Sequence, residues 1–263
     1  MGKCYVARVA KTKGKTRGAS KSTPRAAPKA ARAKPVKPPR PTRPSLPAPP
    51  APPPAPLPRD ELIAPRDIGR LTRYGERFGA TKIDTRLLQH IQLPVGSGQI
   101  AVFDPGAPKS WRVLDRPVGS GFGMFRVMLS VARDDAGGER LAAIVIHVGR
   151  PPIARWAVAH YRGQKKPRSA EQLPRCPVTT GWIAVMDAGT GEPAGVIAVP
   201  ASAAPGQPVE IPLTDGRRAL ALPCGNGEYA AYWAVDAADK PICLVLDFDV
   251  FSAKDWKARP PAP

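Results

Sequence analysis

The first 59 residues contain no aspartate or glutamate, although they hold fifteen of the chain's 40 lysine and arginine residues. The rest of the chain carries 25 basic and 21 acidic side chains, a balance typical of an ordinary globular domain. Most of the formal net charge of +19 therefore belongs to one end of the chain. We expect this segment to bind nucleic acid or another polyanion without sequence preference, because a dense flexible polycation releases counterions on binding.

Acids are not the only residues missing from this segment, since Tyr5 is its only aromatic residue. Lys, Arg, Ala and Pro dominate residues 10–58, which end in the run SLPAPPAPPPAPLP. Such a composition cannot bury enough apolar surface to offset the entropy of ordering. We predict a disordered arm with an extended spacer, similar in composition to linker-histone tails. Its expected polyanion contacts are Lys11, Lys13, Lys15, Arg17, Lys21, Arg25, Lys29, Arg32, Lys34 and Lys37.

Cysteine and long apolar runs are also scarce. The four cysteines, Cys4, Cys176, Cys224 and Cys243, form no Cys-x-x-Cys pair, which disfavours a zinc knuckle. No apolar run is long enough for a signal peptide or a membrane span, so we predict a cytoplasmic protein with no membrane partner. An acid-free, Arg-rich N-terminus also suits a transit peptide, but its prolines oppose the required amphipathic helix. The glycine clusters match no phosphate-binding loop, and we predict no cofactor.

Short apolar segments separated by turn residues recur from residue 90 onward, a pattern typical of all-β domains. We predict an antiparallel β-sandwich, jelly-roll-like, over residues 90–256. A transitional segment, residues 60–89, precedes it, and residues 257–263 form a disordered tail. Short helices are predicted at Arg59–Leu62 and Thr81–Gln89. The predicted strands are Gln99–Phe103, Phe125–Ala132, Leu141–Val148, Ala154–His160, Val178–Met186, Gly195–Val199, Val209–Leu213, Arg218–Leu222, Tyr229–Val235 and Ile242–Phe248.

The last two of these strands flank a polar turn, DAADKP, and form the clearest hairpin in the sequence. Antiparallel pairing across that turn places Trp233 opposite Leu244. In the same register Val235 faces Ile242 and Tyr229 faces Phe248. All six side chains then share one buried face, because side chains alternate along a strand.

Five segments of the predicted sandwich form a recognisable pattern. They are GQIAVFDPG, FRVMLSVA, Arg155-Trp156, PVTTGWIAVMDA and GNGEYAAYWAVDAADKPICLVLDF. Through these segments, residues 90–251 resemble the bacterial domain-of-unknown-function 4241 family. The chain departs from the family pattern at Thr179 and Asn226, where the family has aspartates. The resemblance implies a fold, and the family supplies no established activity.

The hairpin register also gathers three carboxylates on its second face, where Glu228 stands opposite Asp249 with Asp247 close by. Opposed like charges are unfavourable unless they are protonated, solvated or neutralised by a cation. One interpretation is a cation site or an acid–base pair. The other is a solvated rim at the strand ends, neutralised by Arg217, Arg218 or Lys254.

Two further candidates are weaker. Cys224 could act as a nucleophile if His90, His147 or His160 lay beside it, but a free cysteine is usually a small core residue. His147 stands in an apolar strand, which favours a buried structural role. A basic loop beside Tyr161 could contact phosphates, although a solvated loop explains its composition as well. Its basic residues are Arg162, Lys165, Lys166, Arg168 and Arg175.

The sequence therefore favours a non-enzymatic interaction or ligand-binding β-sandwich whose basic arm holds it near a polyanion. The alternative is a hydrolase-like or metal-binding enzyme that uses Glu228, Asp247 and Asp249. A protein partner for the sandwich is compatible with either function.

Overall fold

The computed structural model describes residues 64–119, 122–150, 152–165, 172–189, 191–193, 197–199 and 206–257. The predicted basic arm, the helix at Arg59–Leu62 and the loop residues Lys166 and Arg168 lie outside the described residues. In chain order the elements are η1 (Ile68–Thr72), β1 (Arg77–Phe78), β2 (Thr81–Val95), β3 (Ile100–Asp104), β4 (Ala107–Val113), β5 (Gly123–Arg133), β6 (Glu139–His147), β7 (Arg155–Val158), β8 (Arg175–Val178), β9 (Trp182–Asp187), β10 (Val209–Pro212), β11 (Arg218–Pro223), β12 (Gly227–Val235), β13 (Pro241–Asp247) and α1 (Ala253–Lys257).

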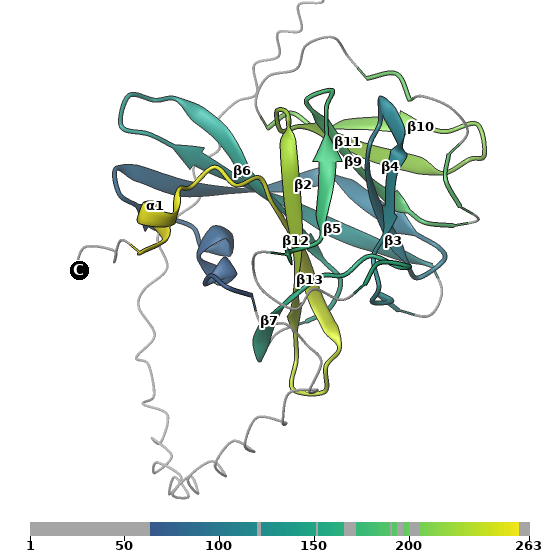
Figure 1. Ribbon diagram of the computed structural model, residues 1–263, viewed down its shortest axis with the longest axis horizontal. Coiled ribbons are helices and arrows are strands. Elements are labelled where there is room, and N and C mark those ends of the chain that lie inside the picture. The colour runs from purple at the N-terminus through teal and green to yellow at the C-terminus, as the bar shows by residue number, and fades with distance from the viewer. Residues whose placement is uncertain are drawn as a thin grey trace, which may run out of the picture. The chain divides into compact units, whose positions relative to one another are not determined.

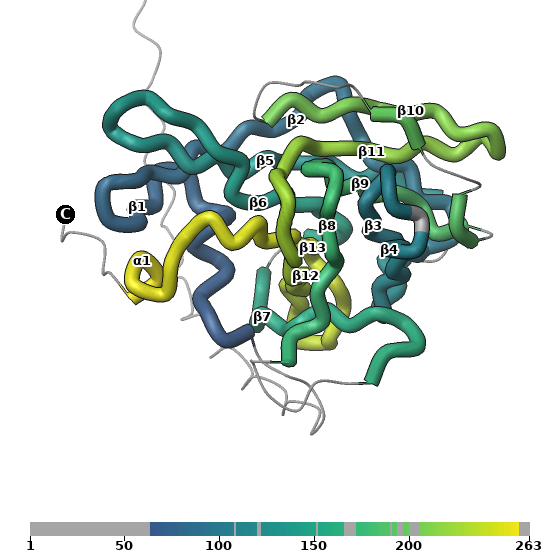
Figure 2. Tube along the Cα trace, turned by 45° about the horizontal axis from the view of Figure 1, so that its top comes forward, coloured from purple at the N-terminus to yellow at the C-terminus, as the bar shows by residue number. Residues whose placement is uncertain are grey.

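The strands form two antiparallel sheets, which confirms the predicted β-sandwich (Figures 1 and 2). The larger sheet has the order β1-β2-β5-β6-β13-β12-β7, and β8 pairs with β12 beside β7. The smaller sheet has the order β10-β11-β9-β3-β4. Hairpins join strands that are neighbours in the sequence, such as β5 with β6 and β12 with β13. Longer connections separate other pairs, such as β2 with β5 and β6 with β13.

Alternating apolar side chains fill the space between the sheets. In β5, Val127, Leu129 and Val131 belong to this core, as the period-2 pattern predicts. The smaller sheet contributes side chains such as Val102 and Val185 from β3 and β9. Since each strand supplies every second residue, the sandwich core forms where the alternation is regular.

The hairpin register is correct at its centre, where Trp233 pairs with Leu244. A β-bulge after Ala234 then pairs Val235 with Pro241, so Ile242 joins the outer face instead of the core. The bulge inserts one residue on one strand, which reverses the side-chain orientation beyond it. The Tyr229 and Phe248 rings meet edge to face with centroids 5.2 Å apart, as expected for neighbours on one face.

Several sequence-based boundaries are wrong. The predicted helix Thr81–Gln89 is the first part of β2, a strand that crosses the proposed domain boundary at residue 90. The predicted strand Val178–Met186 is interrupted by a turn, so that β8 and β9 belong to different sheets. The last turn of α1 includes Lys257, which was assigned to the C-terminal tail. The part of Gly195–Val199 that the structure describes, residues 197–199, is not a strand.

The outer face of the larger sheet is covered at one end by two segments, residues 64–78 and 251–257, which we call the terminal segments. Ile68 and Leu71 from η1 pack there against strand residues such as Val145 and Val245. Phe78 stacks on Phe251 with centroids 4.0 Å apart, and the Trp256 ring meets Phe78 edge-on. Figure 1 shows η1 and α1 on the same side of the sheet. This covering buries β12 and β13 on both faces.

Hydrogen bonds to Asp104 connect the β3–β4 turn with the β8–β9 turn. Its carboxylate is fully buried and accepts backbone N–H bonds from Thr179, Thr180 and Gly106 at 2.7, 3.0 and 2.9 Å. The hydroxyls of both threonines donate to it as well. Burial opposes the charge, but these donors outweigh it and lower the pKa of Asp104 below its ordinary value. The β3–β4 turn is thereby tied to the β8–β9 turn.

Candidate functional site

Two of the three predicted acidic residues come together in one pocket, and the third does not. Asp247 ends β13, and Asp249 follows it with a φ of 50°, in the left-handed region that turns the chain out of the sheet. Glu228 therefore does not face Asp249 in a strand ladder. It is exposed and pairs with Pro177 of β8. The expected triad of carboxylates is wrong, because β13 ends before its predicted partner position.

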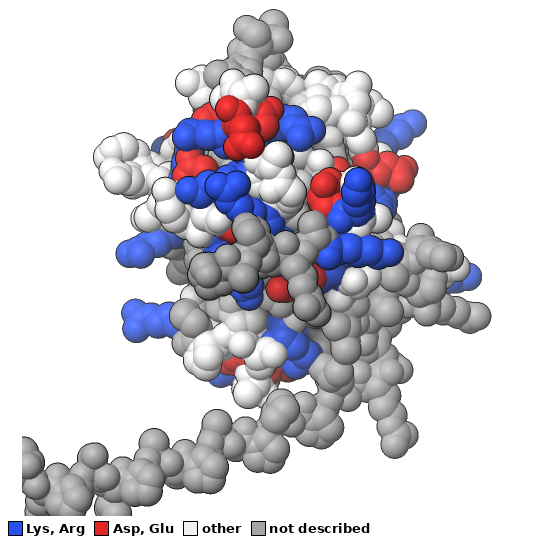
Figure 3. Space-filling model, turned by 90° about the vertical axis from the view of Figure 1, so that its left-hand side faces the viewer, with Lys and Arg blue, Asp and Glu red and all other residues white. Residues whose placement is uncertain are grey.

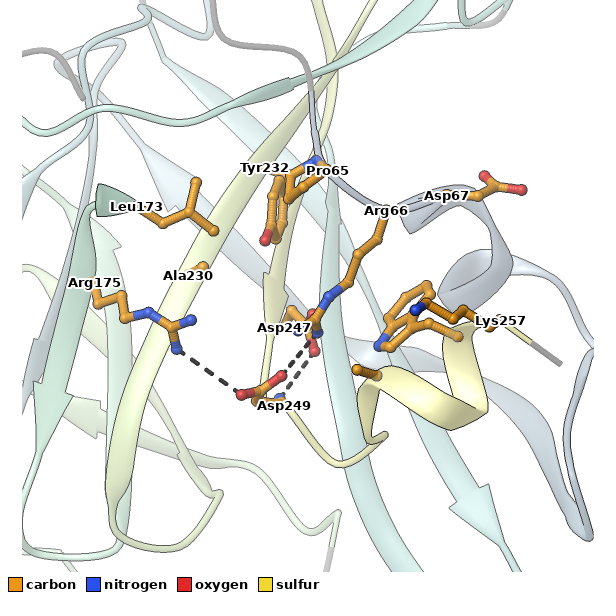
Figure 4. Close-up of a pocket in the computed structure, with 12 residues that line it drawn as sticks. Pro65, Arg66, Asp67, Leu173, Arg175, Ala230, Tyr232, Asp247, Asp249 and Lys257 are labelled. Atoms are coloured by element: carbon orange, nitrogen blue, oxygen red, sulfur yellow. Dashed lines mark hydrogen bonds and ion pairs between the residues drawn. The ribbon is translucent and has the colours of Figure 1, made fainter. Parts of the chain in front are cut away.

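The pocket has a volume of about 470 Å³ and opens on the outer face of the larger sheet. Strands β12 and β13 form its floor, and segments far apart in the sequence form its walls (Figure 4). The walls come from the segment before η1, from the start of β8 and from α1. The lining residues are Pro65, Arg66, Asp67, Leu173, Arg175, Ala230, Tyr232, Asp247, Asp249, Ala253, Trp256 and Lys257.

Asp247 is the buried acid of this pocket, with 4% of its surface exposed. Its Oδ1 accepts the backbone N–H of Asp249 at 2.9 Å. Its Oδ2 lies 3.9 Å from Arg66 Nη1, beyond hydrogen-bond distance, and accepts no hydrogen bond from the described residues. Burial, reinforced by the charge of Asp249, raises the pKa of Asp247 to about 6, against the partial compensation of the Asp249 N–H. Asp247 is thus a buried carboxyl with unused acceptor capacity.

Asp249 lies between two arginines. Arg66 Nη1 donates to Asp249 Oδ1 at 2.8 Å, whereas Arg175 Nη1 lies 3.9 Å from Asp249 Oδ2. Arg175 is held in place by its bond to the backbone oxygen of Glu228 at 2.9 Å. The Arg66 contact is a close ion pair, while the Arg175 contact leaves room for another acceptor. Figure 4 shows both guanidinium groups converging on Asp249 from opposite sides.

Tyr232 projects from the floor of the pocket. Burial and the neighbouring Asp247 charge raise the pKa of Tyr232 to about 12, so its hydroxyl keeps its proton at neutral pH. Figure 4 shows this hydroxyl pointing into the pocket. The site therefore offers a neutral donor and acceptor beside charges of both signs.

The other sequence candidates do not join this pocket. The thiol of Cys224 donates to the Gly225 carbonyl at 3.4 Å, and burial raises its pKa to about 12, which makes it a poor nucleophile. His147 was expected in the core but is exposed at the end of β6, opposite Arg126. Arg162 and Lys165 are exposed in the loop after Tyr161, as a solvated loop predicts.

Sequence reasoning missed the basic side of the pocket. Arg66 was placed in a transitional segment, and Arg175 was grouped with a loop although it begins β8. Tyr232 was not identified as a candidate residue at all. The sequence separation hides these partners, since Arg66 and Asp249 are 183 residues apart.

Comparisons with known proteins add no identity, because no family model, curated protein or solved structure matches the chain. The resemblance to the domain-of-unknown-function 4241 family stays a prediction. Within the described residues, no group of three or more His, Cys, Asp or Glu side chains is arranged to hold a metal ion. None of the helices described is long and apolar enough to cross a membrane.

The raised pKa of Asp247 predicts that this residue destabilises the fold at neutral pH. Between the ordinary value of 3.8 and about 6, the folded state holds a proton that the unfolded state has lost. Stability therefore falls as the pH rises through this range, and above it the full cost of about 3 kcal/mol is present. We expect Asp247→Asn to raise the free energy of unfolding at pH 7.5 by up to about 3 kcal/mol, and to change it little below pH 4.

Urea unfolding of both proteins at the two pH values measures this difference. Asp135→Asn is the matched control, because it makes the same chemical change at an exposed position outside the pocket and should give no increase. An Asp247→Asn protein less stable than the parent at pH 7.5 would contradict the assignment.

Proposed function

We propose that the β-sandwich is a binding module for a small zwitterionic molecule, and that the pocket around Asp247 is its site. The observation that carries this proposal is the buried Asp247 carboxyl, whose Oδ2 faces a 470 Å³ pocket without a hydrogen-bond donor from the described residues. The Asp247 side chain is almost wholly withdrawn from bulk water, so its charged form favours a cationic donor supplied by a bound molecule. Retaining a destabilising group is also typical of sites selected for function.

The charges around the pocket suit a ligand that carries both signs. Its lining holds three basic side chains, Arg66, Arg175 and Lys257, and three acidic ones, Asp67, Asp247 and Asp249. An ammonium group beside Asp247 Oδ2 would satisfy the buried carboxylate. A carboxylate near Arg175 would use the guanidinium that only loosely contacts Asp249. Free amino acids are the simplest molecules with this arrangement.

A thermal-shift and calorimetric titration with free amino acids tests the proposal, with their methyl esters and N-acetyl derivatives as comparison probes. We expect at least one amino acid to stabilise the protein and both derivatives to bind at least about tenfold more weakly, since each lacks one of the two charges. Asp247→Asn and Arg175→Gln should each weaken binding about tenfold, whereas Lys165→Gln, in the exposed loop outside the pocket, should not. Binding should weaken below pH 6, because a protonated Asp247 no longer attracts an ammonium group. Equal binding of the amino acids and their derivatives would contradict the site.

A second candidate function is hydrolase-like acid catalysis on the same residues. It is favoured by the raised pKa of Asp247, about 6, because a carboxyl with a pKa closer to neutral is better suited to act as a general acid or base. Mass spectrometry of the titrated compound after incubation separates the two functions. A compound recovered unchanged supports binding, and a product that Asp247→Asn fails to form supports catalysis.

We further propose that residues 1–59 bind nucleic acid or another polyanion and so localise the sandwich. Their fifteen basic residues and lack of acids support this role. The residues that the structure describes differ in charge pattern, because their basic and acidic side chains are interspersed over the face shown in Figure 3. Such a mixed surface produces a weak field for steering a polyanion.

The arm predicts a salt-dependent interaction with DNA. If six to ten of its charges meet phosphates, affinity for duplex DNA should fall by about 10³–10⁵ between 50 and 200 mM salt. Fluorescence anisotropy should show the isolated arm binding two unrelated duplexes nearly as well as the full chain, while a chain starting at Asp60 loses most of the affinity. If the shortened chain kept its affinity, the DNA-binding site would lie on the sandwich instead, with Arg162 and Lys165 as the first candidates.

A further inference from the structure

The outer face of the larger sheet is covered at one end and open at the other. Along β5, Ser130 and Ala132 are buried beneath the terminal segments, whereas Met124 and Arg126 on the same face are exposed. The neighbouring strand β6 shows the same change, from buried Val145 to exposed His147. The open end is therefore a continuation of a buried apolar face.

Large apolar side chains gather on this open end. Leu87 and Met124 are each 50% exposed, and Phe122 is 73% exposed. Leu87 pairs with Met128 across the β2–β5 ladder. Two hollows of about 660 and 690 Å³ adjoin at Met124, which lines both, and we call the pair the groove. Contiguous exposed apolar surface of this kind is typical of an interaction site.

The groove is bordered by basic side chains. The hollow on β5 and β6 is lined by Arg126, His147 and Arg150, with no acidic residue among its described lining. The second hollow adds Arg217 and Arg218, and its acids are Glu210 and Asp187. The Asp187 carboxylate is already bound by the backbone N–H groups of Gly96 and Ser97. Arg217 is likewise engaged, by Asp215 and by the backbone carbonyls of Asp187, Ala188 and Gly191. The positive charge available to a partner therefore lies mainly on the hollow of β5 and β6, at Arg126 and Arg150.

We propose that this groove docks a segment of a partner protein that carries apolar side chains flanked by acidic residues. The apolar side chains would contact Leu87, Phe122 and Met124, while the acids would pair with Arg126 and Arg150. A second copy of the chain fits less well, because an isologous contact would bring the same arginines together. Nucleic acid is also less suitable, since among the described lining residues only Phe122 and two histidines offer a ring on which a base can stack, and Leu87 and Met124 would be left without an apolar partner.

Two fluorescent probe peptides test the proposal on the full chain at 150 mM salt. Both have alternating leucines, and the intervening positions are Glu in one and Lys in the other. We expect the Leu/Glu peptide to bind at least about tenfold more tightly. R126E/R150E and Met124→Asp should each weaken its binding at least about tenfold. The matched control, R162E/K165E, makes the same charge change in the exposed loop after Tyr161 and should leave binding within about twofold of the parent. The basic arm is present in every variant, so its contribution to peptide binding does not alter the comparison.

Thermal melting checks that the variants remain folded, as exposed positions should allow. Equal losses in the two double variants would overturn the proposal, because they would show attraction by overall charge alone. It would also be overturned if the Leu/Glu peptide bound every variant as tightly as the parent. Loss of binding to a single-stranded oligonucleotide in R126E/R150E, with peptide binding unchanged, would assign the groove to nucleic acid instead.

Discussion

Replacing Asp104 with Asn is expected to lower the free energy of unfolding by about 3–5 kcal/mol at pH 7, because the change removes a buried charge that accepts several hydrogen bonds. The Asn amide would also turn a donor toward the N–H groups of Thr179, Thr180 or Gly106. Each unsatisfied buried donor adds its own cost. Urea unfolding measures the difference.

The pH dependence of this effect follows from the lowered pKa of Asp104. Because the pKa of Asp104 is lower in the folded protein than its value of 3.8 in the unfolded chain, the charged carboxylate stabilises the fold at every pH above 3.8. This stabilisation is lost as the pH falls through the pKa of the folded state. The gap between the parent and Asp104→Asn should therefore narrow in acid. Asp134→Asn is the control, since Asp134 is exposed and its carboxylate accepts the Gly138 N–H in a turn. Equal stability of the two variants at pH 7 would contradict the role of Asp104.

Truncation of Trp233 to Ala is expected to cost about 3–5 kcal/mol, because it leaves a large cavity between the sheets. Trp233 is fully buried in the sandwich core, and its Nε1 donates to Asp115 Oδ1 at 3.4 Å. The backbone of Trp233 is paired with Leu244 of β13 on one side and with Ala157 of β7 on the other. These strand pairings limit how far the surrounding structure can collapse into the cavity.

Thermal and urea unfolding of Trp233→Ala should be compared with Tyr74→Ala, which also truncates an aromatic side chain. Tyr74 is 71% exposed, so its loss should change stability by less than about 0.5 kcal/mol. Similar melting temperatures for the two variants would show that the β12–β13 hairpin does not bury the face that contains Trp233.

Regular alternation explains which parts of the fold could be predicted. The β12–β13 and β5 patterns are periodic, and their core faces are correct. The start of β2 was taken for a helix because its ladder is irregular between Leu87 and Gln92, which breaks the period of two. Leu88 and Leu93 consequently both pack toward the sandwich core, although they are five residues apart and a regular strand would place them on opposite faces. A bulge depends on the partner strand, so one strand's sequence does not reveal it.

The candidate site was only half predictable for a similar reason. Two acids at the end of an apolar strand gave a local signal, and Asp247 and Asp249 do share a pocket. Arg66 and Arg175 reach that pocket from distant segments, through tertiary packing that no local pattern encodes. Glu228 was wrongly included because the register was extended past Asp247, where the chain leaves the sheet.

The most direct test of the Asp247 site is a ¹³C NMR titration of its side-chain carboxyl in the full-length protein, assigned by comparison with Asp247→Asn. A buried carboxyl that lacks a donor on Oδ2 predicts a midpoint near pH 6 without ligand. A bound ammonium compound should lower that midpoint, because it stabilises the charged form. A ligand-free midpoint at or below the ordinary value of 3.8 would show that Asp247 is already satisfied within the protein, and would contradict the proposed binding site.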